Sequence, residues 1–450
     1  MEGTVSTRGQ WTSRIGFILA AAGSAIGLGN IWGFPYKTGA NGGGLFVLIY
    51  LFCVLFIGLP VMIAEIMIGR NTQKSPIAAF QHYTSKWSPW VGVGALGLIG
   101  SVLIMTFYSM IFGWTINYCL RCFFNFFGDK SPEEIKTFYT TLRSGVWEEL
   151  LFHGISMGLT IGILYGGVKE GIEKWSKILM PMLFLIVLGL VLYSAIFLFD
   201  GFKETFKFTF WPNNSLKPSS LLVVVGQAFF SLSLGMGTML TYGSYLSRKD
   251  DIPKASLWIC SLDTSIAIAA CFVVFPIIFQ NHGQPTGGPG LIFESMPVLF
   301  NHIPVGFLFG GAFFLLVAFA ALTSAISITE VPIAYLMDHF GWKRKNACIF
   351  VGVGLFVLGI PCINENAFSL AEAITDWILP LASFFIALFV GWRMPADIRK
   401  SEFLQGNKLK WAYPIWLWLI RIFIPVCLFI IAANKMGFIK TETINRMFGF

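Results

Sequence analysis

The chain has 450 residues, of which 56% are hydrophobic and 12% are charged. Soluble domains carry about 25% charged residues, so this composition excludes a soluble domain and indicates a polytopic membrane protein. The formal net charge of +8 does not indicate nucleic-acid binding, because the basic residues lie mainly in short loops between apolar segments.

Eleven apolar segments are candidates for membrane helices, which need about 20 apolar residues each. The predicted spans are 13–36, 43–69, 89–124, 153–166, 172–199, 220–246, 255–280, 304–338, 346–361, 368–393 and 412–433. Lys and Arg gather in loops that share one side, which the positive-inside rule assigns to the cytoplasm together with the N-terminus. An odd number of spans leaves the C-terminal tail outside, where Lys435, Lys440 and Arg446 run slightly against the rule. We therefore expect a multi-pass protein of the plasma membrane.

The first span carries a glycine-rich stretch, Gly23-Ser-Ala-Ile-Gly-Leu-Gly-Asn30. Glycines destabilise a helix, and irregular backbone at membrane depth is tolerated only where it is buried in protein or lines a cavity. The sixth span repeats the feature in Ser231-Leu-Ser-Leu-Gly-Met-Gly237. A matched pair of interrupted spans in the two halves of a chain predicts a transporter binding site.

The positions of the breaks also predict how the chain is divided. Each break opens a group of five spans, and because five is odd, the second group must be inverted relative to the first. We expect one integral membrane domain, made of a first repeat (1–200), an inverted second repeat (201–395) and an eleventh helix with an external tail (396–450).

The breaks would supply groups that bind both a cation and a small molecule. Unwound residues lose their helical partners, which frees backbone carbonyls for a cation and exposes helix ends that attract opposite charges. A zwitterionic amino acid suits such a pair of ends. Side-chain oxygens near the breaks belong to Asn30, Ser231, Asp263, Thr323 and Ser324. Taken alone, Thr323 and Ser324 are more simply explained by hydrogen bonds to their own helix.

Acidic residues inside spans are stronger evidence of a functional site than hydroxyl groups, because an unpaired charge in the membrane is costly. The examples are Glu65, Asp263 and Glu330. Asp263 lies between apolar runs of the seventh span, too far from its ends for the side chain to reach water, which favours a functional role.

Three other features of the sequence bear on function. The loop at 281–303 mixes turn residues with an apolar stretch, and it fits an outer lid and an ordinary long loop equally well. Cys119 and Cys122 form one CxxC without a second pair, which is explained by small apolar side chains on a helix. The chain has no HExxH, GxSxG or Walker motif, so we expect no enzymatic activity.

Several motifs resemble those of a known family. They are the run Trp11–Tyr36 with Asn41-Gly-Gly-Gly44, the run Gly226–Gly235 with Tyr242-Gly-Ser-Tyr245, and Ala321-Leu-Thr-Ser324. The chain resembles the neurotransmitter:sodium symporters from Arg8 to Asp338, and more weakly to about residue 395. Eleven spans suggest the short bacterial branch. The resemblance implies an all-α fold of the LeuT type, with a 5+5 inverted repeat and unwound helices 1 and 6.

The resemblance also implies two sodium sites. The first would use the Ala25 carbonyl with Asn30, Ser231 and Asp263, completed by the substrate carboxylate. The second would use backbone carbonyls and hydroxyls of Gly23, Ile26, Ala320, Thr323 and Ser324.

A central substrate site is implied in the same way. The carboxylate would meet the amides near Leu28 and Gly29 and the Tyr108 hydroxyl. Beside Ser231, the side-chain pocket would include Ala25, Phe229, Phe230, Ser233, Met236, Ala325 and Ile328. Phe230 and Tyr108 would close the outer side.

The implied inner gate pairs Arg8 with Asp338, and it has Trp11, Ser244 and Tyr245 nearby. Glu65 would satisfy amides of the unwound segments. The carboxylate of an outer gate would be near Glu372 or Asp376.

The chain departs from the family pattern near the first sodium site. Tyr50, Gln227 and Ser231 match the surroundings of the family's chloride site. Many members have a carboxylate or a bound chloride there, but the neighbouring position in this chain is Ala267. Many members also have Asn at the position of Asp263. We expect Asp263 to supply the negative charge itself, which predicts chloride independence.

Two further departures concern the gate and the pocket. Gly33 stands where most members have an outer-gate Arg, which puts the outer salt bridge in doubt. Met236 replaces a common aromatic residue, and a flexible thioether adapts to different shapes. With Ala25 and Ala325 small, this favours a broad range of bulky apolar amino acids.

Gly171 and Pro181 border the inner end of the fifth span. Glycine unwinds easily and proline lacks a backbone donor. We predict local unwinding there that lets water reach the second sodium site. The alternative is a helix start with an ordinary proline kink.

The expected function is a sodium-coupled symporter that imports hydrophobic L-amino acids, aromatic and branched aliphatic, by alternating access. Substrate would complete the first sodium site and so couple the two ligands. The alternative is a proton-coupled amino acid carrier, but such carriers usually have a Lys at the second ion site, and none lies in the core of spans one, five, six or eight. A channel or a transporter-derived sensor also stays open. The expected partners are the substrate and the lipid bilayer, with no nucleic acid.

Overall fold

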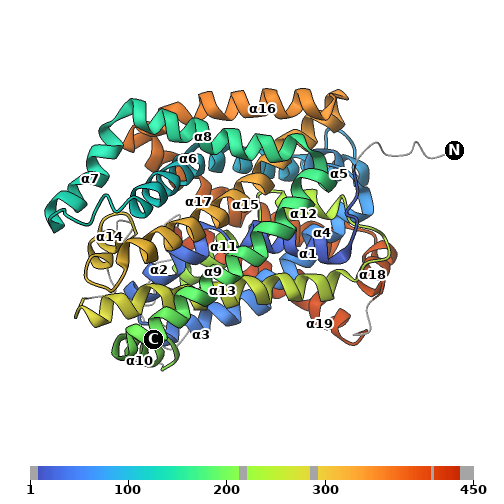
Figure 1. Cartoon of the computed structure of the whole chain (residues 1–450). Coiled ribbons are helices and arrows are strands. Elements are labelled where there is room, and N and C mark those ends of the chain that lie inside the picture. Colours follow the sequence, from blue (N-terminus) through green and yellow to red (C-terminus); the bar gives the residue numbers. More distant parts are fainter. Residues whose placement is uncertain (1–8, 212–219, 284–291, 407–409, 436–450) are drawn as a thin grey trace.

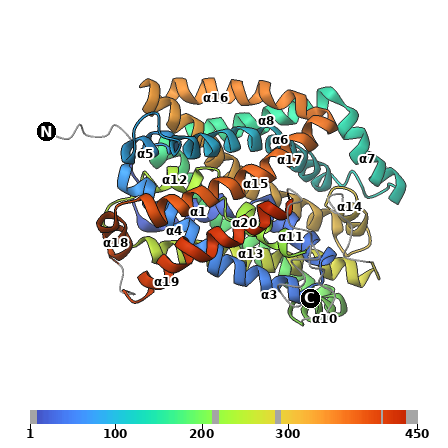
Figure 2. The same cartoon turned by 180° about the vertical axis from the view of Figure 1, so that it is seen from behind.

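The computed structural model describes residues 9–211, 220–283, 292–406 and 410–435, and α-helices make up most of this part of the chain. The long helices run between two ends of the molecule (Figure 1). One end carries α5 (Pro76–Tyr83) and α18 (Ala396–Leu404), and we refer to it as the α5 end. The other, the α7 end, carries α7 (Pro132–Ser144), α10 (Phe199–Phe210) and α14 (Ser295–Phe300), as the view from behind also shows (Figure 2).

The first half of the chain supplies five groups of helices where five spans are predicted. They are α1 (Arg14–Ala25), η1 (Gly29–Gly33) and α2 (Phe34–Ala40); α3 (Gly44–Cys53), η2 (Val54–Gly58) and α4 (Leu59–Thr72); α6 (Val91–Phe123); α8 (Val146–Tyr165); and η3 (Val168–Glu173) with α9 (Lys174–Phe197). The η segments in this half are wider π-helical turns.

The second half supplies five further groups of helices and a last group that follows them. Its elements are α11 (Ser220–Ser231) and α12 (Thr238–Gly243); α13 (Ile252–Gln280); α15 (Gly306–Phe340); α16 (Arg344–Gly359) and η5 (Ile360–Ile363); α17 (Glu365–Leu388) and η6 (Phe389–Arg393); and α19 (Ala412–Trp418), η7 (Leu419–Phe423) and α20 (Ile424–Lys435).

Within the described ranges, eight helices are long and apolar enough to cross a membrane. If the bent pair of α1 and α2 is counted as one span, the number is nine. The predicted fourth span corresponds to α8, and the sixth to the two short helices α11 and α12. Neither meets the same combination of length and apolarity. The chain is therefore a multi-pass helical protein, and the count of eleven stays a prediction.

The first predicted break is present but narrower than expected. α1 continues as a regular helix through Gly23 to Ala25, and a bend of 51° separates it from the helix that starts at Gly29. Gly23 was expected to belong to the unwound stretch, and this was wrong. A Cβ atom at Gly23 would lie 3.2 Å from the Cβ of Thr323, so this glycine allows α15 to approach α1 closely.

The second break lies where it was predicted. α11 ends at Ser231, and α12 begins at Thr238. Between them the backbone turns through left-handed conformations at Ser233 (φ 53°), Gly235 (φ 79°) and Gly237 (φ 76°). Two of these three positions are glycines, which adopt such angles at no steric cost.

The predicted unwinding of the fifth span is not seen in this conformation. The segment that contains Gly171 is a π-helical turn, and α9 runs regularly through Pro181. A Cβ atom at Gly171 would lie 2.1 Å from the Ile163 carbonyl oxygen, so the glycine here permits close contact with the end of α8.

Candidate functional site

A carboxylate and three polar side chains meet beside the first break. Asp263 on α13 is fully buried, and its Oδ1 accepts a hydrogen bond of 2.7 Å from Nδ2 of Asn30. The Ser231 hydroxyl donates to both carboxylate oxygens at 3.0 Å, and the Tyr50 hydroxyl donates to Oδ2 at 3.2 Å. A buried carboxylate surrounded by oxygen and amide groups is a suitable environment for a hard cation.

This cluster contains three of the four protein residues predicted for the first sodium site. The fourth, Ala25, is the last residue of α1 and lines the small cavity next to the break. Residues from η1, α11 and α13, far apart in the sequence, are thus brought together. Their role as ion ligands stays a prediction.

The residues predicted for the second sodium site also lie together, where α15 crosses the end of α1. The Ser324 hydroxyl lies 3.1 Å from the Ser24 carbonyl oxygen and 3.5 Å from that of Gly23. The Thr323 hydroxyl donates to the Ala320 carbonyl at 3.1 Å. These hydroxyls bond to nearby carbonyls, and each oxygen keeps lone pairs that a cation could use.

Ile26 completes this group at the point where α1 stops. Its backbone is extended (φ −74°, ψ 92°), so its carbonyl no longer points along the helix. A carbonyl freed in this way is a typical cation ligand at a helix break. Ligation by these five residues is likewise a prediction.

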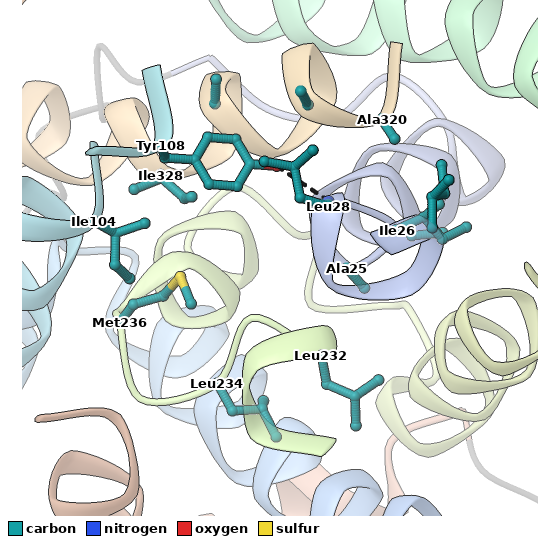
Figure 3. Packing of buried hydrophobic residues seen from close by; sticks show 14 of the residues in the cluster. Ala25, Ile26, Leu28, Ile104, Tyr108, Leu232, Leu234, Met236, Ala320 and Ile328 are labelled. Atoms are coloured by element: carbon teal, nitrogen blue, oxygen red, sulfur yellow. Dashed lines mark hydrogen bonds between the residues drawn. The ribbon is translucent and has the colours of Figure 1, made fainter. Parts of the chain in front are cut away.

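A small cavity of about 20 Å³ lies between the two breaks. Figure 3 shows Ala25 and Leu28 beside the first break, Met236 in the second, Ile104 and Tyr108 on α6, and Ile328 on α15. Eight residues predicted to bind substrate line this cavity: Ala25, Leu28, Gly29, Tyr108, Phe230, Ser233, Met236 and Ile328. The lining is mainly apolar, with the backbone of the first break on one side.

Three predicted pocket residues have other positions. Phe229 lines the larger chamber described below, and Ser231 belongs to the Asp263 cluster. Ala325 is buried in α15 and is not among the described residues that line the cavity. Sequence reasoning missed Ile104, although it precedes Tyr108 by one helical turn and so shares its face.

The Tyr108 hydroxyl marks the polar edge of the cavity. The Leu28 amide donates to it at 3.5 Å (Figure 3). A Cβ atom at Gly27 would lie 3.0 Å from this hydroxyl and 2.5 Å from Oγ of Ser324. Gly27 therefore leaves the backbone open to these two polar side chains.

A second chamber of about 330 Å³ lies on the α7-end side of the small cavity, and we refer to it as the vestibule. Tyr108 and Phe230 line both spaces and so stand at their boundary. The predicted gate residue Glu372 lines the vestibule. Its other charged lining residues are Lys37 and Asp376.

The α5 end is closed by Trp11. Its backbone amide donates to the Tyr245 carbonyl at 3.2 Å, and its indole Nε1 donates to the Tyr242 carbonyl at 3.0 Å. Both tyrosine rings pack against the indole. Ser244 is buried and donates to Thr241. Trp11 thus fills the space between α1 and α12.

The predicted pair of Arg8 and Asp338 can be described only in part, because Arg8 lies outside the described residues. Asp338 Oδ2 accepts a hydrogen bond of 2.6 Å from the Ser75 amide at the start of α5. Glu65 accepts one of 2.7 Å from the Gly235 amide in the second break. A carboxylate of α4 thus stabilises the unwound backbone.

A buried ion pair at the α5 end was missed as a site. Glu330 is fully buried, and the two nitrogens Nη1 and Nη2 of Arg344 contact its carboxylate at 2.8 and 2.6 Å. The Tyr245 hydroxyl also donates to Glu330 at 2.6 Å, and Arg344 Nε donates to the Leu164 carbonyl at 3.0 Å. These contacts join α8, α15, α16 and the turn that follows α12. Glu330 is an intramembrane charge in the sequence, but its partner Arg344 is the first residue of α16 and lies among the basic residues predicted for a loop, so hydropathy does not connect the two.

The N-terminal segment is held by a second carboxylate that sequence reasoning did not identify. Glu173 on η3 accepts hydrogen bonds from the Thr12 amide at 2.7 Å and the Thr12 hydroxyl at 2.5 Å. The Ser13 hydroxyl donates to it at 3.1 Å, and Lys177 pairs with it at 2.6 Å. A Cβ atom at Gly16 would lie 2.1 Å from Glu173, so that glycine lets the carboxylate reach α1.

The fold and the site define a polytopic helical membrane protein of the transporter class, with a binding region where two broken helices meet. The family model described as the sodium:neurotransmitter symporter family matches residues 8–131 and 147–449. The chain therefore belongs to this family. It is a sodium-coupled transporter with the predicted LeuT-type fold, and, as predicted, it is not an enzyme.

The chain is similar to characterised and uncharacterised transporters over most of its length. The Bacillus subtilis protein YhdH, described as an uncharacterized sodium-dependent transporter, is 34% identical over 96% of this chain and 98% of its own length. The human sodium- and chloride-dependent GABA transporter 2 is 24% identical over 87% of this chain and 74% of its own length. The crystal structure of MhsT in complex with L-phenylalanine matches with a TM-score of 0.86 and 38% identity, covering 95% and 99% of the two chains.

Proposed function

We propose that this sodium-coupled transporter is a symporter that imports hydrophobic L-amino acids, aromatic and branched aliphatic, by alternating access. The observation that carries the proposal is the small, mainly apolar cavity between the two helix breaks, with an oxygen cluster on either side. An apolar wall selects an apolar side chain, and polar backbone at one edge suits the charged end of an amino acid.

The carboxylate of the substrate is proposed to meet the amides of Leu28 and Gly29, beside Tyr108. These amides lie at the start of a helical segment, where backbone N–H groups lack helical acceptors and favour negative charge. The side chain would contact Met236 and Ile328. The similarity to MhsT, whose structure contains L-phenylalanine, supports this substrate class.

Two sodium ions are proposed, one at the Asp263 cluster and one at the group that contains Thr323 and Ser324. The substrate carboxylate would be a ligand of the first ion, which couples ion and substrate binding. We propose that transport is chloride-independent, because Asp263 itself supplies the negative charge at the first site and Ala267 offers no group to bind an anion. The human GABA transporter 2, whose description includes chloride, provides the contrast.

The proposed orientation puts the α5 end in the cytoplasm and the α7 end outside, following the distribution of Lys and Arg. In this orientation the vestibule faces outward, and Trp11 closes the inner side. Substrate would enter past Phe230 and leave after the α5 end opens.

The test is uptake of labelled Phe, Leu and Trp into proteoliposomes under an inward sodium gradient, with chloride present or replaced by gluconate. Sodium-dependent uptake that survives without chloride is expected. Uptake that needs chloride would refute the role given to Asp263. Uptake driven by a proton gradient alone would favour a proton-coupled carrier, the alternative on this fold.

A further inference from the structure

The charged residues of the vestibule suggest a gating role for Lys37. Lys37 lies in the last turn of α2 and is half-buried. Its Nζ donates a hydrogen bond of 2.8 Å to Oε1 of Gln227, which is fully buried on α11. Nε2 of Gln227 in turn donates to the Gly29 carbonyl at 2.6 Å. A continuous chain of hydrogen bonds therefore joins the vestibule to the first helix break.

Gly33 makes room for this chain. A Cβ atom at Gly33 would lie 3.3 Å from Oε1 and 3.8 Å from Nε2 of Gln227. A methyl group would make the Gln227 amide shift by a few tenths of an ångström. Gly33 and Lys37 are separated by one helical turn and lie on the same face. The amide fills the space that a side chain at Gly33 would occupy, and Lys37 reaches it from the next turn.

Two carboxylates face this lysine from another helix. Glu372 and Asp376 are one turn apart on α17, and both line the vestibule together with Lys37 and Tyr36. Lys37 and Glu372 interact electrostatically, and Tyr36 interacts with both carboxylates. Opposite charges attract more strongly as water is excluded from the space between them.

We propose that Lys37 is the gate cation of the vestibule. It holds Gln227 on the broken helix and attracts the Glu372–Asp376 face of α17, so that the vestibule closes over a bound substrate. This inference rests on the proposed function, because it assumes an amino acid in the central cavity. Lys37 acts as a positioning residue, since it lines the vestibule and not the central cavity.

The experiment measures the dissociation rate of labelled Phe from the purified full chain in sodium, after dilution into unlabelled Phe. Lys37→Gln should raise this rate about fivefold or more, while the sodium concentration needed for half-maximal binding stays unchanged. Lys37→Arg should restore a slow rate, because it keeps the charge. Lys207→Gln is the matched control, since Lys207 is an exposed lysine at the same end that pairs with Glu204.

A second variant tests the chain of hydrogen bonds without removing a charge. Gly33→Ala should also speed dissociation, because the added methyl group shifts the Gln227 amide and weakens its bond to Lys37. The charge-swapped double variant Lys37→Glu with Asp376→Lys should release Phe more slowly than Lys37→Glu alone.

If the wild-type chain binds Phe in sodium but Lys37→Gln releases it at the wild-type rate, the gate assignment is wrong and the proposed function stands. If the wild-type chain shows no sodium-dependent binding of Phe, Leu or Trp, the proposed function itself fails.

Discussion

The two ends of the molecule are closed in different ways. At the α5 end, Trp11 packs between α1 and α12, Glu173 accepts hydrogen bonds from Thr12, and Arg344 pairs with the buried carboxylate of Glu330. At the α7 end, an open vestibule of about 330 Å³ is lined by charges on α2 and α17. The α5 end is thus sealed by directed, buried contacts, whereas the α7 end depends on charges that are partly accessible to water. In the proposed orientation, this conformation is closed toward the cytoplasm.

The largest expected effect comes from breaking the buried ion pair. Glu330→Gln removes the fully buried carboxylate that pairs with the partly buried guanidinium of Arg344, so the closed α5 end should lose about 3 to 5 kcal/mol of stability. Faster hydrogen exchange in α1 and α16 and a lower unfolding temperature would show this loss. The matched change at the other end is Glu365→Gln, which removes an ion pair with Arg143. The two charged atoms are 3.9 Å apart and the Glu365 side chain is 83% exposed, so this change should alter stability by less than about 0.5 kcal/mol. Equal effects of the two changes would contradict the contrast between the ends.

Removing the aromatic plug should have the next largest effect. Trp11→Ala loses a buried indole and its bond to the Tyr242 carbonyl, which should cost about 3 kcal/mol. Concentrative uptake should fall because the inner side leaks, while sodium-dependent binding in detergent weakens. Trp11→Phe keeps a ring and loses the indole bond, so its effect should be about 1 kcal/mol. Uptake by Trp11→Ala at the wild-type level would show that Trp11 does not seal this end.

The smallest of the three effects is expected at Glu173. Glu173→Gln weakens the bonds to Thr12 and Ser13 and should destabilise the closed α5 end by about 1.5 kcal/mol. The readout is hydrogen exchange at the start of α1, compared with exchange in α7 at the opposite end. Lys177→Ala serves as the control, because Lys177 is 41% exposed and its loss leaves the bonds from Thr12 in place. If Glu173→Gln and Lys177→Ala change hydrogen exchange equally, the Glu173 carboxylate contributes only through its ion pair with Lys177.

Local features of the fold were predictable from the sequence. The break in the sixth span follows from Gly235 and Gly237, because their backbone angles are ones that glycine adopts without strain. The first break falls between Ala25 and Gly29, inside the predicted stretch Gly23–Asn30, which was too long at both ends. A glycine in a membrane helix can mark either unwinding or close packing, and only its neighbour Thr323 distinguishes the two.

The charged contacts show the limit of sequence reasoning. Glu330 was noticed because a carboxylate at membrane depth needs a partner, but Arg344 had the pattern of an ordinary loop residue. Lys37 was not connected to Gln227, which lies 190 residues away. Long side chains reach several ångströms in any direction, so hydropathy and spacing do not determine which charges meet.

The sequence by itself determined the membrane class, the apolar spans and the two interruptions, because these depend on composition and on local backbone preference. Motifs around the breaks also indicated the family. Only the tertiary structure decided that Asn30, Ser231 and Asp263 form one cluster, that Glu330 faces Arg344, and that Gly33 leaves room for the bond between Lys37 and Gln227. These are contacts between distant segments, and they depend on how helices cross and on which side chains fill the space between them.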